Sequence, residues 1–175
     1  MIPNLTVLNK KEGSHISWES ELKITRIDIS IDVDTNFFYA GLDPGSSRLG
    51  IALGTHLWEI EIKRDDTTPT RMNHIWRLLN QLIPYAKYLT IEGPSYADRY
   101  RQVELQDIRC GAACWAMNDS RNIEVLVVPP LTIRKVVFGS AKIKNPWKEQ
   151  GIPDNAAAAL GCALYPIMKN KEKIK

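Results

Sequence analysis

The sequence predicts an α/β protein whose mixed sheet is flanked by helices. In the first part of the chain, β-type segments follow one another with only turns between them. In the second part, apolar segments alternate with stretches of helical periodicity. Strands joined by tight turns run antiparallel, and strands joined through helices run parallel. We therefore expect three antiparallel strands, followed by two strands that run parallel to the first of them.

The composition is that of an ordinary globular chain with one domain. It has 175 residues, of which 44% are hydrophobic and 25% charged, and its net charge of +3 permits nucleic-acid binding without requiring it. The three cysteines lie in apolar stretches without metal-ligand spacing, which predicts reduced core thiols in a cytoplasmic protein. No signal peptide is evident, and no apolar run reaches the roughly 18 residues of a membrane span, so we expect no membrane association.

Residues 1–36 precede the predicted core as an N-terminal extension. Between Ile27 and Val33, apolar residues alternate with Asp28, Ser30 and Asp32, which is typical of a half-buried strand. We expect the extension to contain strands. Three roles stay open for it: it extends the sheet, covers its edge, or contributes to a dimer contact.

The remaining elements are predicted from periodicity and from turn residues. We expect strands over 37–43, 48–54 and 57–64, and later strands over 87–92 and 123–128. A helix is predicted from Arg71 to about Ala86 with Thr70 as its cap, because its apolar residues have helical spacing. Further helices are expected after residue 100, over 131–139 and from Asp154 onward, with a basic loop over 140–153.

Three acidic residues stand where such a fold gathers functional groups. Asp43 and Glu92 each end a predicted strand, and Asp154 opens the last helix. The carboxyl ends of parallel strands face the functional crevice of an α/β sheet, and clustered carboxylates suit Mg²⁺ or Mn²⁺. Each acid also has an ordinary explanation, because Asp43 and Glu92 precede turn residues and Asp154 suits a helix N-cap.

Four segments resemble the motifs of RuvC-like Holliday-junction resolvases, within the RNase H-like superfamily. GLDPGSSRLGIAL (41–53) is similar to the first motif, and LTIEGP (89–94) with ELQDIRCGAACWA (104–116) to the second motif and its helix. VPPLTIRKVVFGSAKIK (128–144) and IPDNAAAALGCALY (152–165) resemble the segments that close the domain. The resemblance implies an RNase H-like, five-stranded mixed sheet in a nuclease domain over 37–170, with the extension 1–36 before it and a tail over 171–175.

The same resemblance implies a metal-dependent endonuclease that cleaves branched DNA, especially four-way junctions, as a homodimer. Asp43, Glu92 and Asp154 would be its catalytic and metal-binding acids. Lys142 and Lys144 lie where the family carries basic residues that face the cleaved strand, with Lys142 as a further catalytic candidate. A solvated loop would explain these two lysines equally well.

The closing motif departs from the family pattern. The family has an acid, or sometimes His, followed three residues later by Asp, and alignment on Ala159-Leu160 places Asn155 and Ala158 at these two positions. One carboxylate is therefore missing, and Asp154 stands one residue early. The chain is then a single-Asp nuclease, a naturally weakened one, or one altered to abolish cleavage. Two other functions stay open: a non-catalytic RNase H-like domain that binds nucleic acid or protein, and a YqgF-type RNA-processing nuclease.

Further basic residues are candidates for DNA contact. Arg99, Tyr100 and Arg101 follow Glu92, and two guanidinium groups around an aromatic ring suit phosphate contact and base stacking. Lys135 with Arg134 would add to a basic rim. The plain start of a surface helix explains the first three residues equally well.

Overall fold

The computed structural model of the chain describes residues 2–13, 22–33, 35, 38–45, 47–62, 67–94, 101–118 and 122–173, without side chains at 101–104 and 171–173. In this part of the chain, one seven-stranded sheet has the order β1-β2-β5-β4-β3-β6-β7. Its strands are β1 (Leu5–Glu12), β2 (Lys23–Ile31), β3 (Tyr39–Asp43), β4 (Arg48–Leu53), β5 (His56–Glu61), β6 (Tyr88–Glu92) and β7 (Glu124–Val128).

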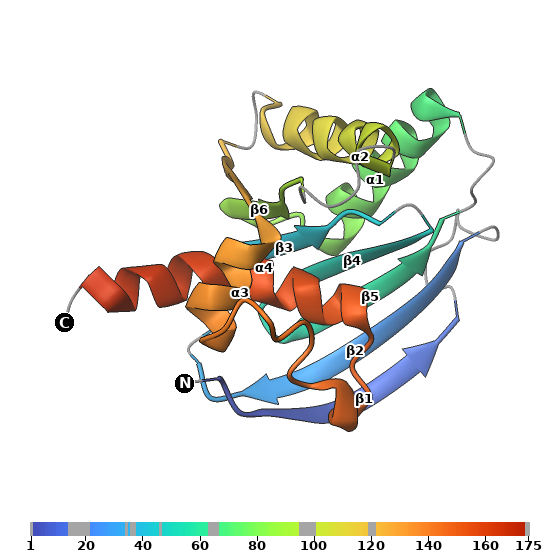
Figure 1. Cartoon of the computed structure of the whole chain (residues 1–175). Coiled ribbons are helices and arrows are strands. Elements are labelled where there is room, and N and C mark those ends of the chain that lie inside the picture. Colours follow the sequence, from blue (N-terminus) through green and yellow to red (C-terminus); the bar gives the residue numbers. More distant parts are fainter. Residues whose placement is uncertain are drawn as a thin grey trace.

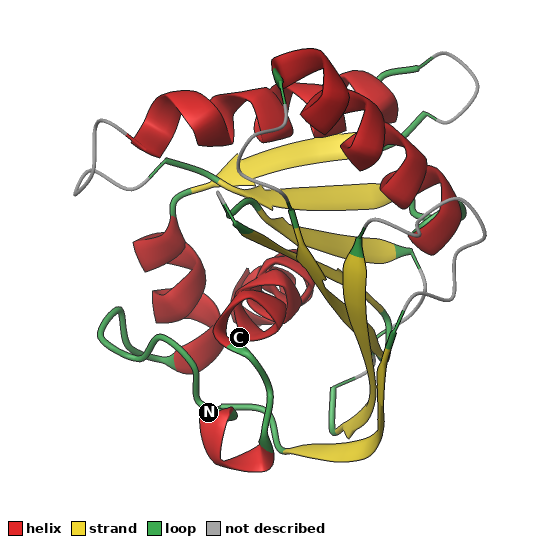
Figure 2. Ribbon diagram, turned by 90° about the vertical axis from the view of Figure 1, so that its right-hand side faces the viewer, coloured by secondary structure: helices red, strands yellow, loops and turns green. Residues whose placement is uncertain are grey.

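Helices cover both faces of the sheet (Figures 1 and 2). One face carries two helices, α1 (Thr68–Leu82) and α2 (Arg101–Ala116). The other face carries α3 (Pro130–Phe138), the short 3₁₀ helix η1 (Lys148–Gln150) and α4 (Asp154–Lys173). In Figure 2, α4 is seen nearly end-on and is enclosed by the curved sheet.

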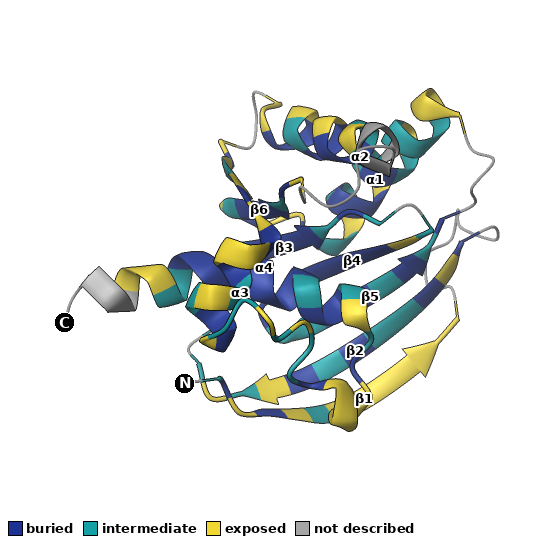
Figure 3. Ribbon diagram, in the orientation of Figure 1, coloured by how far each residue is buried: buried dark blue, intermediate teal, exposed yellow. Residues whose placement is uncertain are grey.

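The strand directions agree with those predicted from the sequence. Strand β3 pairs antiparallel with β4, and β4 pairs antiparallel with β5. Strand β3 pairs parallel with β6, and β6 pairs parallel with β7. These five strands form the expected mixed sheet of an RNase H-like fold. The N-terminal extension adds β1 and β2 as an antiparallel hairpin next to β5, so it extends the sheet, and β1 is exposed along most of its length (Figure 3).

Glycines bring α4 directly onto the sheet. A Cβ atom at Gly41 of β3 would overlap with the Ala159 carbonyl oxygen, and one at Gly50 of β4 would overlap with that of Asn155. Alanines line the buried side of α4 where it meets these strands. Since neither partner has a large side chain, the two backbones approach closely. This contact holds the start of α4 near the carboxyl end of β3.

The structure corrects two local predictions. Helix α1 begins at Thr68 with Thr67 as its N-cap and ends at Leu82, rather than running from Arg71 to Ala86. Pro69 lies in the first turn, where proline's fixed φ favours a helix start and its missing N–H costs nothing, and this position sets the earlier beginning.

The cysteine prediction was wrong for two of the three thiols. Cys110 and Cys114 lie one turn apart on the outer side of α2 and are exposed, whereas Cys162 is buried. An apolar stretch in a helix still has an outward side, which the sequence pattern did not resolve. No helix in the described part of the chain is long and apolar enough to cross a membrane.

Candidate active site

Asp43 and Glu92 lie side by side at the carboxyl ends of two parallel strands. In the pairing of β3 with β6, Leu42 is opposite Ile91, so the next residues, Asp43 and Glu92, are also neighbours. Leu42 and Ile91 belong to the core beneath α1 and α2. Because successive side chains alternate between the faces of a sheet, both acids point to the α4 face. The structure therefore brings two of the predicted acids together.

The surroundings of this acid pair disfavour its negative charge. Burial raises the pKa of Asp43 well above its ordinary value of 3.8, and the neighbouring Glu92 carboxylate raises it further. Burial likewise raises the pKa of Glu92. Two adjacent carboxylates in a partly desolvated position repel each other, and a cation placed between them would remove both penalties.

Two arginines oppose part of this repulsion. Arg109 of α2 is only 6% exposed, and its Nε donates to the Glu92 backbone oxygen at 2.9 Å, which fastens α2 to the end of β6. The positive charges of Arg134 and Arg109 lower the pKa of both Asp43 and Glu92, with Arg134 having the larger effect. The pair therefore lies within the field of two positive charges.

The structure distinguishes the two basic residues of α3. The Lys135 side chain is exposed, whereas Arg134 is half-buried and its charge acts on the acid pair. The buried residues of α3 include Pro130, Ile133 and Val137. Position 134 lies one turn from Pro130 and beside Ile133, so the helical period of the buried residues carried the signal.

The structure does not bring Asp154 into one cluster with Asp43 and Glu92. Asp154 is exposed in the first turn of α4, and its Oδ1 accepts a hydrogen bond from Asn145 Nδ2 at 2.9 Å. Burial raises the pKa of Glu59 on β5, and the charges of Glu61 and, to a smaller extent, Asp154 raise it further. Among the described residues, no group of three His, Cys, Asp or Glu side chains is placed to hold one metal ion.

The two positions of the departing motif lie on the side of α4 that faces the strands. Asn155 Nδ2 donates to the Arg48 backbone oxygen at 2.6 Å, next to the turn that follows Asp43. Ala158 is half-buried and lies one turn before Cys162. Burial, Glu92 and Asp43 raise the pKa of the Cys162 thiol, so Cys162 lies within the field of both acids. Ala158 shares that helical face, nearer the carboxyl end of β3.

The structure describes the side chains of only some of the residues predicted to contact DNA. Lys142 and Lys144 are exposed in the loop between α3 and α4. Arg99 and Tyr100 lie outside the described residues. Arg101 begins α2, and its side chain also lies outside the description. The roles of all these residues stay predictions.

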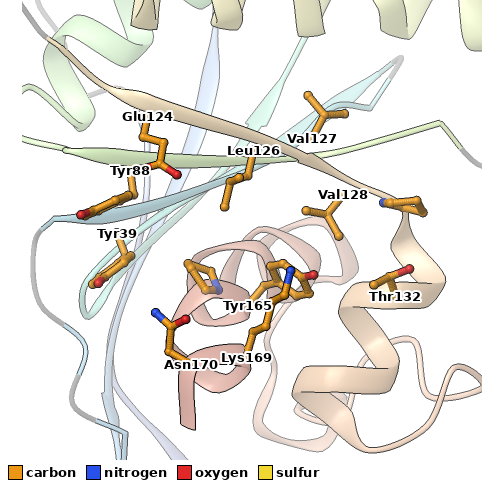
Figure 4. A pocket seen from close by; sticks show the side chains of 12 residues that line it. Tyr39, Tyr88, Glu124, Leu126, Val127, Val128, Thr132, Tyr165, Lys169 and Asn170 are labelled. Carbon is orange, nitrogen blue, oxygen red and sulfur yellow. The ribbon is translucent and has the colours of Figure 1, made fainter. Parts of the chain in front are cut away.

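A pocket lies between the starts of β3 and β6, strand β7 and the later part of α4 (Figure 4). Its volume is about 610 Å³. Tyr39 and Tyr88, at the starts of β3 and β6, stack there with ring centroids 4.8 Å apart. Tyr165 and Lys169 of α4 form the other wall. The pocket extends along β7 to Val128, the residue that pairs with Glu92, but neither Asp43 nor Glu92 is among its lining residues.

Comparison with solved structures identifies the architecture. A structure of RuvC from Thermus thermophilus matches with a TM-score of 0.57 and 15% sequence identity, covering 77% of this chain and 95% of that chain. The chain has a RuvC-like fold. The structure of T. thermophilus RuvC in complex with a Holliday junction substrate matches with the same TM-score and 18% identity, covering 76% and 94% of the two chains.

The structural comparison confirms the RuvC-like resemblance that the sequence motifs predicted, at the level of the fold. No family model matches the sequence, and no curated protein sequence matches it. At 15–18% identity, the likeness to RuvC concerns the fold. About a quarter of this chain has no counterpart in the matched structures, since they cover 77% and 76% of it.

Proposed function

We propose that this chain is a divalent-metal-dependent endonuclease that cleaves branched DNA such as four-way junctions. The observation that carries the proposal is the Asp43–Glu92 pair at the carboxyl ends of β3 and β6 in a RuvC-like fold. A RuvC of similar structure forms a complex with a Holliday junction substrate. The substrate class of this chain is inferred from that complex.

The acid pair fits a hard divalent cation. Carboxylate oxygens are the ligands that Mg²⁺ and Mn²⁺ prefer, and the raised pKa of both acids is expected where two carboxylates share one site. Asp43 and Glu92 would hold the ion. When bound, it would polarise the phosphodiester and stabilise the charge that develops on its oxygens.

Other residues would position the substrate and balance charge. Arg109 keeps the end of β6 in place through the Glu92 carbonyl. Arg134 on α3 is half-buried and acts electrostatically on the acid pair, so it is suited to a phosphate oxygen of the cleaved strand. Lys142 and Lys144 would contact phosphates further along that strand. A homodimer would present two such sites to the two strands of a junction.

A second candidate function is a non-catalytic domain that binds nucleic acid or protein. No third acid among the described residues is placed to share a metal ion with Asp43 and Glu92, which favours this candidate because two carboxylates offer fewer ligands than the family's set. Asp154 stays a candidate for a third ligand. A YqgF-type RNA nuclease is the third candidate, on the strength of the DNAAAAL segment.

Cleavage of synthetic substrates separates the three candidates. The unaltered chain and Asp43→Asn are compared on a four-way junction, a matched duplex, single-stranded DNA and structured RNA, each with Mg²⁺ or Mn²⁺. Junction-selective cleavage that is lost in Asp43→Asn supports the proposal. Binding without cleavage in either metal favours the non-catalytic domain, and selective cleavage of RNA favours the YqgF-type nuclease.

Lys142 and Lys144 can be tested within the same substrate set. Replacing both by Ala should weaken junction binding and flatten its salt dependence, because fewer counterions are released when fewer phosphates are neutralised. Binding is measured without divalent metal across a salt series. An unchanged slope of log affinity against log salt would mean that this loop does not touch phosphate.

A further inference from the structure

The N-terminal hairpin makes a buried contact with the loop that carries Lys142 and Lys144. Trp147, in this loop, is 2% exposed, and its indole Nε1 donates to the Pro3 carbonyl oxygen at 3.1 Å. The two residues are 144 positions apart in the sequence. Figures 1 and 2 show the loop, with η1, lying against the β1 side of the molecule. Since donor and acceptor are buried, removing either leaves a polar group unsatisfied.

Packing adds to this contact from two directions. The Trp147 ring meets Phe138 of α3 edge to face, with centroids 5.3 Å apart. Leu5 of β1 and Ile27 and Ile29 of β2 belong to the same buried cluster. The side chain that anchors the loop therefore lies between the nuclease domain and the hairpin.

The anchor is connected to the lysines through Asn145. The Asn145 Oδ1 accepts a hydrogen bond from the Trp147 backbone N–H at 3.0 Å, and its Nδ2 donates to the Ile152 carbonyl and to Asp154 Oδ1, both at 2.9 Å. Lys144 directly precedes Asn145, and Lys142 lies two residues earlier. These bonds fix the backbone next to the exposed lysines and join it to the start of α4.

The segment that supplies the acceptor is itself fastened to the hairpin. Asp32, just after β2, accepts hydrogen bonds from the Asn4 backbone N–H at 3.0 Å and from Asn4 Nδ2 at 3.1 Å. The Asp32 backbone N–H donates in turn to the Asn4 carbonyl at 3.1 Å. Asn4 follows Pro3, so Asp32 holds the Pro3 carbonyl in place from the outer side of the hairpin.

We infer that the N-terminal hairpin is a positioning element for DNA binding, which holds the basic loop so that Lys142 and Lys144 meet the substrate phosphates. Trp147 is the positioning residue and acts through these two lysines. The inference rests on the proposed function, in which this loop contacts phosphate. A loop that is already ordered loses less conformational freedom when it binds, so loosening it lowers affinity without removing a charge.

The first test is a double-mutant cycle on junction affinity, measured without divalent metal. Trp147→Phe keeps an aromatic ring and removes the indole N–H. We expect its affinity to fall about fivefold, an effect of the size of one hydrogen bond. In the background Lys142→Ala/Lys144→Ala, Trp147→Phe should change affinity little, because the residues through which it acts are gone. An equal loss in both backgrounds would mean that Trp147 only stabilises the fold, and would overturn the inference.

The second test approaches the loop from the hairpin and does not depend on a core substitution. Asp32→Asn loosens Asn4, and Glu12→Gln is its matched control, because both side chains are exposed acids at the ends of hairpin strands. Each variant removes one negative charge, but only Asp32 holds the segment with Pro3. We expect Asp32→Asn to flatten the salt dependence toward that of the lysine variant, and Glu12→Gln to leave it unchanged. Equal behaviour of the two variants overturns the inference.

Failure of the inference can be told apart from failure of the proposed function. If the chain binds no nucleic acid, or if Lys142→Ala/Lys144→Ala binds as the unaltered chain does, the loop's role in the proposed function fails and the inference fails with it. If the lysines matter and both tests come out negative, the positioning role alone is wrong.

Discussion

Two aspartates in the same sheet have opposite electrostatic surroundings. Burial alone would raise the pKa of Asp28, but hydrogen bonds from Arg26 and His56 lower it below its ordinary value of 3.8. Arg26 Nε lies 2.9 Å from Asp28 Oδ1, and His56 Nδ1 lies 2.7 Å from it. Burial raises the pKa of Asp43 too, and there the nearest strong influence is another carboxylate, Glu92.

The difference separates a structural acid from a candidate catalytic one. Asp28 joins β2 to β5 through partners that compensate its charge. Asp43 belongs to an acid pair whose repulsion Arg134 and Arg109 offset in part, and a further cation would relieve the rest. Acids whose pKa is raised by burial and by a neighbouring acid often cluster at functional sites, whereas an acid paired with basic residues is commonly structural.

Neutralising each aspartate and measuring cleavage is the most direct test of this difference between Asp43 and Asp28. Asp43→Asn should lower the rate of junction cleavage by at least about 100-fold, the scale for removing one strong electrostatic contact in a reacting site. Asp28→Asn should leave the rate within about twofold at a temperature where both variants are folded, because Asp28 is not near the acid pair. Similar losses in the two variants would contradict the assignment of Asp43 to the site.

The next largest effect is on stability and concerns the close contact of α4 with β3. Gly41→Ala places a methyl group into the Ala159 backbone, and we expect the free energy of unfolding to fall by about 3 kcal/mol. Gly111→Ala in α2 is the control. There the added atom would meet Met72 at an ordinary 3.5 Å, and helix propensity favours Ala by up to about 1 kcal/mol. Urea unfolding of both variants measures the difference, and equal stabilities would refute the close approach.

Adding an acid near Asp43 should raise activity, whereas neutralising Asp43 should lower it. Ala158→Asp supplies a carboxylate at the position where the resemblance expects one, and cleavage at matched Mg²⁺ should rise about tenfold, equivalent to roughly 1.4 kcal/mol of barrier. Ala157→Asp adds the same charge one residue earlier, on a fully buried side of α4, and should give no gain. No gain from Ala158→Asp, with full activity in the unaltered chain, would mean that Asp154 completes the site without it.

The last comparison of the two aspartates concerns the pH dependence of stability. The folded-state pKa of Asp43 is raised, so its ionisation costs stability as pH rises above about 3.8. Asp43→Asn should therefore stabilise the metal-free protein near neutral pH, and the gain should shrink as pH falls toward 3.8. The folded-state pKa of Asp28 is lowered, so its stabilising effect is present above 3.8 and lost as pH falls through the folded value.

Asp28→Asn should accordingly destabilise the protein near neutral pH, by about 1.5 kcal/mol for its charged hydrogen bonds. Thermal or urea unfolding of the two variants from pH 3 to pH 8, without divalent metal, checks both signs. Parallel pH curves for Asp43→Asn and the unaltered chain would contradict the raised pKa of Asp43.

The sequence alone determined the order of the elements, the parallel strands β3, β6 and β7, and the proximity of Asp43 and Glu92. These features follow from local periodicity, from turn residues and from the rule that helical connections join parallel strands. An acid at the end of each of two such strands must reach the same edge of the sheet if the strands are neighbours. The motifs that resemble the RuvC-like family predicted that these two strands are neighbours.

Only the tertiary structure decided which other groups surround the acids. It placed Arg134 rather than Lys135 by the pair, set Asp154 near Glu59, and joined Trp147 to Pro3. Each of these outcomes depends on the rotation of a helix or the path of a loop, which packing against distant segments fixes and local periodicity does not encode. Contacts across 144 residues, such as Trp147 with Pro3, have no signature in either segment until the chain has folded.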